Sequence, residues 1–444
     1  MDRIREIVLS VGRLDLRERL AQVRRSRLVR QNLTLFAGGL VAGIGGFVYH
    51  AIAGRVLGPE KYGEVAFLIA VYAVGTAPAL ILIVVLARYT ATLAARGAEG
   101  VSSLLTRTIR LVTIPSLVAI LFTTLLARPL ASFEHLGSTI PVLILGFSIA
   151  LIWQVAIPRG ILQGLQRFTA LSLNLSLELV VRTAAVVALL SYYAVSGAMA
   201  AVLLGLIFAF GLGLFTLRDH LRPSATRVHL RVMAGFSLTA AAGIIGVQIL
   251  YNQDVILAEH YLSSHAGGIY GGLNKIGTIL YFLTLSVSQV LFPRVVEAVA
   301  KDQHPGRILL YSAGILTVLG AGALLVFGVV PGLVVGVLFG PSFKDAVPFV
   351  FAVGVIGLAL SLNNLLVQFF MAVHDRVFLP ILALGVIAEG GAIVLLHANV
   401  GQVVADVVVT LVGLLVLLAV RCYMLLPTLS AASLGEAEPK PALS

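Results

Sequence analysis

The sequence predicts an all-α membrane protein that crosses the bilayer about twelve times, with its helices divided between two six-helix lobes. Three observations lead to this fold class: the recurrence of long apolar segments, the distribution of Lys and Arg between them, and an internal repeat. The chain has 444 residues, of which 59% are hydrophobic and 11% charged. Its mean hydropathy of +1.03 is far above what a soluble domain needs to bury its core. Lipid is therefore the expected solvent.

The apolar segments are the elements of this fold. A hydrocarbon core of about 30 Å takes roughly 20 apolar residues as helix. Backbone polar groups in hydrocarbon have to pair within their own segment, so each segment is expected to be helical. Pro78, Pro115 and Pro331 fall inside three of them and predict kinks. The expected spans, in order, are 33–53, 64–86, 108–127, 140–157, 168–191, 196–217, 232–253, 268–292, 308–338, 347–372, 377–396 and 402–424.

The positive charges set the expected topology. Of the 31 Lys and Arg residues, 25 fall on one alternating set of segments, including nine within residues 1–30. The positive-inside rule assigns that set and both termini to the cytoplasm, and it predicts a multi-pass protein of the cytoplasmic membrane. The net charge of +11 then reflects topology and contact with the anionic inner leaflet, which argues against a nucleic-acid partner. The outer loops carry four positive residues, Arg55, Lys61, Arg128 and Lys344.

A repeat divides the spans into two halves. Tyr62-Gly63 and Tyr270-Gly271 each follow a Leu-containing helix end, and the two pairs are 208 residues apart. Six spans per half is an even number, so both halves enter the membrane in the same direction, as in transporters built from parallel repeats. The predicted organisation is a basic amphipathic segment at 1–31, an N-lobe at 32–217, a cytoplasmic linker at 218–231, a C-lobe at 232–426 and a cytoplasmic tail at 427–444.

Ionisable side chains within the spans are the candidate functional residues, because charges are costly in hydrocarbon. Asn174, Glu178 and Arg182 are spaced i, i+4, i+8 and form one polar stripe on a helix. This stripe has to face protein or water. Glu178 and Arg182 either neutralise each other as an intrahelical pair or line a cavity, and the sequence leaves both alternatives open.

A second polar group surrounds the turn between the seventh and eighth spans. Asp254 and Lys275 either pair with each other, or Lys275 offers its charge to an anionic head group while Asp254 meets hydroxyls or a coupling cation. Amides in and near the spans either bond helix to helix or line a cavity. These amide candidates are Asn252, Asn274, Asn363, Asn364 and Gln368.

The motifs of enzymes are not found in the sequence. It has no Gly-x-Ser-x-Gly elbow, no Gly-rich phosphate loop and no metal-ligand spacing of His, Cys and Asp. Cys422 is the single cysteine, which excludes an intrachain disulfide. We therefore expect no catalytic residues, no metal site, no cofactor and no enzymatic activity.

With these residues in place, the chain resembles the polysaccharide transporters, or oligosaccharide flippases, of the multidrug/oligosaccharidyl-lipid/polysaccharide (MOP) flippase superfamily. The resemblance covers most of residues 31–400. The motifs that carry it are AGRVLGPEKYG at 53–63, NQDVIL at 252–257, IYG at 269–271, QVLFPR at 289–294, LFG at 338–340 and NN at 363–364.

The resemblance implies two lobes around a central cavity that opens alternately to each side. It also implies export of a polyprenyl-diphosphate-linked oligosaccharide across the cytoplasmic membrane. We hypothesise that a gradient of H⁺ or Na⁺ drives the export. In this hypothesis Arg182 and Lys275 bind the diphosphate, the amides contact the sugars, and Glu178 or Asp254 carries the coupling ion. The alternatives are a multidrug cation antiporter of the same superfamily and a membrane-embedded glycan-assembly enzyme or scaffold.

Overall fold

The computed structural model describes residues 27–94, 98–221, 238–300 and 305–435, and these residues contain helices and no strand. Nine helices in this part of the chain are long and apolar enough to cross a membrane. Two of them, 43–94 and 168–216, are 52 and 49 residues long, which is enough for two crossings each. The predicted all-α membrane fold is confirmed.

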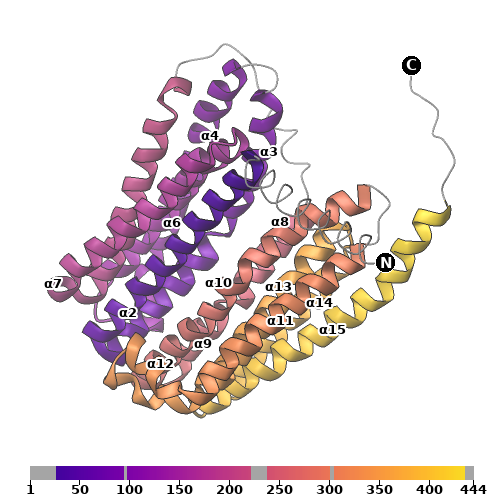
Figure 1. The fold of residues 1–444 in the computed structure, drawn as a ribbon. Coiled ribbons are helices and arrows are strands. Elements are labelled where there is room, and N and C mark those ends of the chain that lie inside the picture. The colour runs from indigo at the N-terminus through magenta and orange to yellow at the C-terminus, as the bar shows by residue number, and fades with distance from the viewer. Residues whose placement is uncertain (1–26, 95–97, 222–237, 301–304, 436–444) are drawn as a thin grey trace, which may run out of the picture.

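The helices form two lobes (Figure 1). The N-lobe contains α2 (Arg27–Gly75), α3 (Ala77–Ala94), α4 (Ala98–Leu125), α5 (Ala127–Phe133), α6 (Ile140–Gly164), α7 (Phe168–Thr216) and the short η1 (Arg218–His220). The C-lobe contains α8 (Leu238–Leu250), α9 (Gln253–Tyr261), α10 (Ser264–Ala300), α11 (Pro305–Val329), α12 (Pro331–Leu338), η3 (Pro341–Phe349), α13 (Val350–Ala372), α14 (Phe378–Leu395) and α15 (Val400–Gly435).

Each of the two longest helices bends between its two crossings. In α2 the bend lies at Gly58, whose φ of 71° is a left-handed conformation that glycine adopts without steric cost. Pro59 follows and lacks the N–H that would continue the helical hydrogen bonds. In α7 the bend lies at Ala194, with φ 44°. The first two predicted spans are thus joined by a sharp bend in one helix.

The lobes contact each other through α2 and α3 on one side and α8, α9, α10 and η3 on the other. Figure 1 shows the lobes close together at the end where α9 and α12 lie and diverging toward the other end. We call the first end the closed end. It contains the bend at Gly58, the turn after Phe133, the turn between α9 and α10, and η3.

The two copies of the Tyr-Gly repeat pack against each other at the closed end. A Cβ atom added to Gly271 would lie 2.7 Å from Cβ of Ala66, and one added to Gly268 would lie 1.8 Å from the carbonyl oxygen of Pro59. Helices α2 and α10 therefore approach as closely as their backbones allow, as small residues permit in membrane bundles. The repeat that the sequence shows is part of the contact between the lobes.

An aromatic cluster extends this contact onto η3. Phe339 packs on Gly54, where a Cβ atom would lie 2.4 Å from its ring, and the rings of Phe339, Phe343 and Tyr62 have centroids 4.9–5.7 Å apart. Arg55 donates to the carbonyl oxygens of Gly336 and Val337 at the end of α12, where the last turn of a helix leaves acceptors free. Two of the motifs behind the resemblance, at 53–63 and 338–340, meet here.

One hydrogen-bonded contact joins the lobes deeper in the interface. Helix α2 ends at Gly75, and near its end Ala73 O accepts hydrogen bonds from Thr76 N at 3.1 Å and from Thr76 Oγ1 at 2.6 Å. Gln248 Nε2 on α8 donates to Ala73 O at 2.8 Å and to Thr76 Oγ1 at 3.2 Å. At 1.5 Å per residue, Ala73 lies about 22 Å along the helix from Gly58. Contact between the lobes therefore reaches from the closed end to mid-depth.

Three boundary predictions are wrong. The predicted ninth span, 308–338, is broken at Val330, where α11 has ended and α12 begins with Pro331, because proline cannot continue the helical hydrogen bonds. The predicted seventh span, 232–253, continues as α9 to Tyr261 after a break at 251–252. Arg159, which the topology rule assigns to the cytoplasm, lies within α6 and is 7% exposed.

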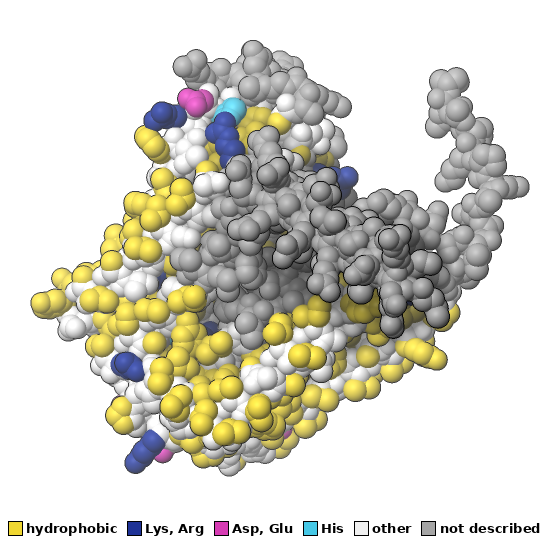
Figure 2. All heavy atoms as spheres, in the orientation of Figure 1, with side chains coloured by type: hydrophobic (Ala, Val, Ile, Leu, Met, Phe, Trp, Pro, Cys, Tyr) yellow, Lys and Arg dark blue, Asp and Glu magenta, His cyan; other side chains and the backbone are white. Residues whose placement is uncertain are grey.

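Several predicted segments fall outside the described residues: most of the amphipathic segment 1–31, most of the linker 218–231, and the end of the tail 427–444. The described surface agrees with a bilayer environment. Figure 2 shows hydrophobic side chains over the sides of both lobes, and large exposed side chains such as Phe122, Leu325 and Val409 belong to different helices, α4, α11 and α15. Such apolar cover is what lipid tails require.

Candidate functional site

The N-lobe holds a buried polar cluster between α6 and α7. Arg159 on α6 forms an ion pair with Glu178 on α7 and donates from Nε to Asn174 Oδ1 at 2.9 Å. Asn174 in turn donates to the carbonyl oxygen of Ala209 at 2.7 Å. Glu178 is therefore neutralised by Arg159, which lies beyond the predicted span 140–157 but inside α6. The suggested intrahelical pair of Glu178 with Arg182 is not formed.

The C-lobe holds a second cluster around Asp254 on α9. Asp254 Oδ2 accepts hydrogen bonds from Tyr270 Oη at 2.8 Å and Asn274 Nδ2 at 2.9 Å, both on α10. Glu389 on α14 lies close enough for its charge to interact with Asp254, and Gln253 donates to Glu389 at 3.1 Å. Both acids are at most 3% exposed. Asp254 makes no ion pair with Lys275 in the described residues.

Two cations face the interface between the lobes at mid-depth. Arg182 on α7 of the N-lobe and Lys275 on α10 of the C-lobe are half-buried, and their charges interact with each other and with His50. The charge of Asp254 also acts on Lys275, more strongly than that of Arg182 does. Arg182 lies over the ring of Tyr49, with Cζ 4.1 Å from the centroid. Within the described residues, no carboxylate forms an ion pair with Arg182 or Lys275.

The predicted amides are separated by the fold. Asn274 supports Asp254, and Asn363 on α13 donates to the carbonyl oxygen of Leu411 on α15 at 3.1 Å. Asn252 bonds to Gln248 of the preceding turn. Asn364 is buried, and Gln368 lies one turn further along α13. Asn363 thus joins two helices, as amides in membrane bundles often do.

The acidic and the basic side chains of these clusters differ in their surroundings. Each of the acids described above is paired with a cation or hydrogen-bonded inside its own lobe, whereas Arg182 and Lys275 make no ion-pair contact with a carboxylate in the described residues. Asp254 acts on Lys275 through its charge without such a contact. The sequence signals Glu178, Arg182, Asp254 and Lys275 as charges within spans. It gives no comparable signal for Arg159 or Glu389, because Arg159 follows a proline near the expected end of a span and Glu389 stands alone among apolar residues.

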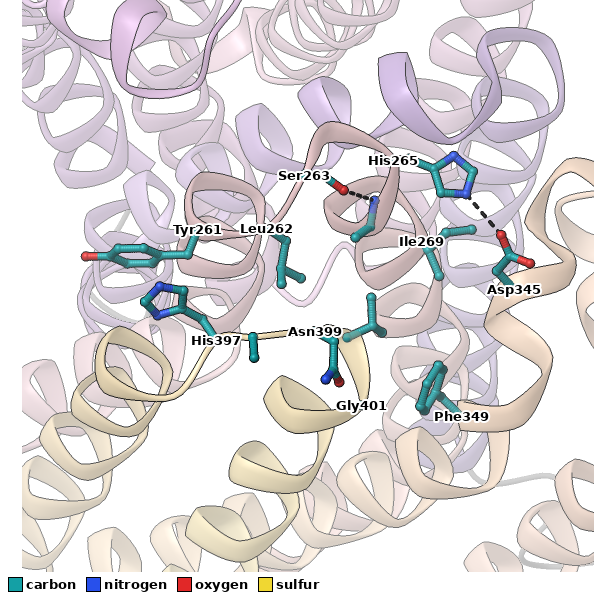
Figure 3. Close-up of a pocket in the computed structure, with 13 residues that line it drawn as sticks. Tyr261, Leu262, Ser263, His265, Ile269, Asp345, Phe349, His397, Asn399 and Gly401 are labelled. Carbon is teal, nitrogen blue, oxygen red and sulfur yellow. Dashed lines mark hydrogen bonds and ion pairs between the residues drawn. The ribbon is translucent and has the colours of Figure 1, made fainter.

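A separate recess lies on the outer rim of the C-lobe at the closed end (Figure 3). Its volume is about 500 Å³, and it is formed by the turn between α9 and α10, by η3 and by the loop before α15. His265 pairs with Asp345 at 3.1 Å, and the rings of Tyr261 and His397 stack with centroids 4.5 Å apart. Both members of the His265–Asp345 pair are about half exposed, so this recess lies apart from the buried clusters.

A group of three or more His, Cys, Asp or Glu residues able to hold a metal ion does not occur in the part of the chain that the structure describes. The oxygens that could take a hard cation belong to Asp254, Glu389, Tyr270 and Asn274. Of these, Asp254 Oδ1 and Glu389 Oε1 are buried and have no hydrogen-bond partner among the described residues.

Solved structures with similar folds belong to the MOP superfamily. A multidrug resistance MATE family transporter in the inward-facing conformation has a TM-score of 0.76 at 13% identity, with 90% of this chain and 99% of that chain covered. In the outward-facing conformation such a transporter has a TM-score of 0.68 at 14% identity, covering 92% and 98%. A MOP superfamily transporter from Pyrococcus furiosus, described as having a binding pocket of reverse polarity, has a TM-score of 0.65 at 16% identity, covering 92% and 98%.

Sequence comparison gives the family. None of the curated proteins matches this chain. The model of a family described as polysaccharide biosynthesis protein matches residues 28–299, which is more than half of the chain. The chain therefore belongs to the polysaccharide biosynthesis protein family and is a multi-pass membrane protein with the fold of the MOP-superfamily transporters.

Proposed function

We propose that this protein is a flippase that moves a polyprenyl-diphosphate-linked oligosaccharide across the cytoplasmic membrane by alternating access. The observation that carries the proposal is the pair of cations, Arg182 and Lys275, which come from different lobes, interact through their charges and make no ion-pair contact with a carboxylate in the described residues. Two such charges at mid-depth attract an anion, and a diphosphate offers several acceptor oxygens to both. The family's description as polysaccharide biosynthesis supports a glycan carrier as substrate.

The conformation supports the alternating-access part of the proposal. The closed end contains three of the four positive residues of the expected outer loops, Arg55, Lys61 and Lys344. With the positive-inside topology, the closed end faces out of the cell and the lobes diverge toward the cytoplasm. The higher TM-score with the inward-facing relative agrees with this orientation. A head group bound in this state enters from the cytoplasmic side, as an exporter requires.

The C-lobe cluster is the proposed site of the coupling ion. Two neighbouring carboxyl groups in a dry environment do not both stay charged on their own. Either one of them binds a proton, or a cation binds between them. Asp254 and Glu389 fulfil this condition, and Tyr270 and Asn274 add the hydroxyl and amide that hold Asp254 in place. Glu178 is the weaker of the two predicted ion-coupling candidates, because Arg159 already compensates its charge.

A multidrug cation antiporter is the second candidate function. The acid pair of Asp254 and Glu389 and the fold of the MATE relatives favour it. It requires acidic groups to line the path between the lobes. In the described structure Glu178 and Asp254 are bonded inside their own lobes, and Arg182 and Lys275 lie at mid-depth between the lobes, so an anionic substrate is favoured.

Ligand-induced stabilisation separates the two candidates. Purified protein is heated with an undecaprenyl-diphosphate oligosaccharide or with a lipophilic aromatic cation, and the unfolding temperature is recorded. We expect the diphosphate to raise it in the wild type and not in Lys275→Gln or Arg182→Gln, while Lys61→Gln, an exposed cation at the closed end, behaves as the wild type. Stabilisation by the lipophilic cation alone would favour the antiporter.

A further inference from the structure

Three carboxylates from both lobes meet at the closed end. Glu64 lies on α2 and Glu134 directly after α5, both in the N-lobe, whereas Glu259 lies on α9 of the C-lobe. Their charges interact with one another. This group lies at the contact that has to separate if the closed end opens.

Two of these carboxyls are buried without a partner. Glu134 is 5% exposed and Glu259 is 6% exposed. Atom Oε2 of each is inaccessible and has no hydrogen-bond partner in the described residues. Glu64 differs, because it pairs with Lys61 one turn before it on α2. A charged carboxylate is strongly disfavoured in such surroundings, whereas a protonated carboxyl is disfavoured much less.

The Glu259 side chain occupies a space that two glycines leave open. A Cβ atom on Gly63 of the N-lobe would lie 1.9 Å from Oε1 of Glu259, and one on Gly267 would lie 2.4 Å from Oε2. The carboxyl group is therefore held directly between the backbone of α2 and that of α10. It reaches across the interface and touches the other lobe only because both positions lack a side chain.

A histidine lies next to the carboxyls on the same interface. The His260 ring stacks on Phe133 at 3.7 Å between centroids, and His260 Nδ1 lies 2.8 Å from the carbonyl oxygen of Phe133, the residue before Glu134. No ion pair joins Glu134 or Glu259 to a cation in the described structure. The titratable and charged groups around the two carboxyls are Lys61, Tyr62 and Glu64 on α2, His135 in the turn after α5, and His260 on α9.

We propose that Glu134 and Glu259 form a proton-binding site between the lobes, and that protons bound there hold the closed end shut. With both carboxyls neutral, the lobes pack without a buried charge. Loss of the protons leaves like charges facing each other across the interface, and separation of the lobes relieves this repulsion by admitting water. The site thus couples the pH on that side of the membrane to opening of that end.

The size of the effect follows from Glu134, which lies outside the membrane-spanning helices. Burial, and after it the charge of Glu64, raises the pKa of Glu134 from its ordinary value near 4.5 to about 8. The closed state is therefore stabilised below pH 4.5 and loses this stabilisation as the pH rises toward 8. For one carboxyl whose pKa is about 8 in the closed state and near 4.5 in the open state, the ratio of open to closed molecules increases about 50-fold between pH 6 and pH 8. Deprotonation of Glu259 adds to this factor.

Distance measurements by pulsed electron paramagnetic resonance test the proposal. In a Cys422→Ala background, spin labels are attached after Gly137→Cys in the N-lobe and Asn399→Cys in the C-lobe, both exposed positions at the closed end. The protein is studied in lipid nanodiscs at pH 6 and pH 8, with no substrate added. We expect the longer, open distance to gain population at pH 8. Glu134→Gln and Glu259→Gln should each reduce the change, and the double variant should abolish it.

Glu60→Gln is the matched control, since Glu60 is an exposed carboxylate at the same end of α2, and it should respond to pH as the wild type does. Equal distances at pH 6 and pH 8 in the wild type would overturn the proposal, as would an unchanged pH response in the double variant. The inference deepens the proposed function, because it takes opening of the closed end as a transport step. The distances are measured without substrate, so the result of this test does not depend on which substrate the protein moves.

Discussion

The ion pair of Arg159 and Glu178 makes a quantitative prediction for stability. Both side chains are 8% exposed, and Arg159 also donates to Asn174. Arg159→Met leaves Glu178 charged in a low-dielectric environment, which costs about 3–5 kcal/mol. Asn174 loses one hydrogen bond but keeps the one to Ala209, so this loss adds about 1 kcal/mol. We expect Arg159→Met to lower the free energy of unfolding by about 4–6 kcal/mol.

The double variant, Arg159→Met with Glu178→Leu, should recover most of this loss, because replacing both members of a buried pair by apolar groups is often close to neutral. Unfolding by denaturant in detergent micelles measures each variant, and the double-mutant cycle gives the coupling. Lys61→Met is the control, since Lys61 is 53% exposed and its pair with Glu64 contributes less than about 1 kcal/mol. A loss below about 1 kcal/mol for Arg159→Met, or a coupling near zero, would refute the reasoning.

Two further contacts between the lobes give predictions. Gln248→Leu removes the hydrogen bond that Gln248 donates across the lobes to Ala73 O. It should increase the open population at the closed end by about 3- to 18-fold, because hydrogen bonds between membrane helices contribute about 0.6–1.7 kcal/mol. An unchanged open population in the spin-label distances would contradict this. Phe339→Ala empties the space on Gly54 and should lower the free energy of unfolding by about 3–5 kcal/mol, whereas Phe351→Ala, at a half-exposed ring, should lower it by less than about 1 kcal/mol. Equal losses in the two phenylalanine variants would show that the Phe339 contact is not specific.

Hydropathy was sufficient to predict the fold class, because lipid forces each long apolar segment into a helix. It could not place the bends or the exact ends. The break at Pro331 and the continuation of α9 beyond 253 depend on how neighbouring helices supply partners for free backbone groups. Arg159 was misplaced for a related reason. A count of positive charges assigns each Arg near a span end to a loop, and only packing against Glu178 shows that this one is inside.

The candidate site was predicted in part. Arg182, Lys275, Glu178 and Asp254 stand out in the sequence because charges within spans are rare. Their partners stand out only in part, because Asn274 is among the predicted amides and Glu389 is not. Tyr270 and Asn274 meet Asp254 across a turn, and Glu389 comes from a helix more than a hundred residues later in the chain.

The carboxyls at the closed end were not predicted at all. Glu134 and Glu259 fall in segments that the span assignment treats as loops, where acidic residues are ordinary and solvated. Their burial results from the contact between the lobes and from two glycines, Gly63 and Gly267, that lie about 200 residues apart in the sequence. No local pattern carries that information.

The central claim is that two cations between the lobes, Arg182 and Lys275, bind the diphosphate of a lipid-linked glycan during its movement. The direct measurement is transfer of a fluorescent undecaprenyl-diphosphate oligosaccharide between the leaflets of liposomes containing the purified protein. The wild type should transfer it, and Lys275→Gln and Arg182→Gln should each slow the transfer about ten- to a hundredfold, because each loses a charge-assisted bond of about 1.5–3 kcal/mol. Transfer no faster than in protein-free liposomes, or equal rates in the wild type and both variants, would contradict the account.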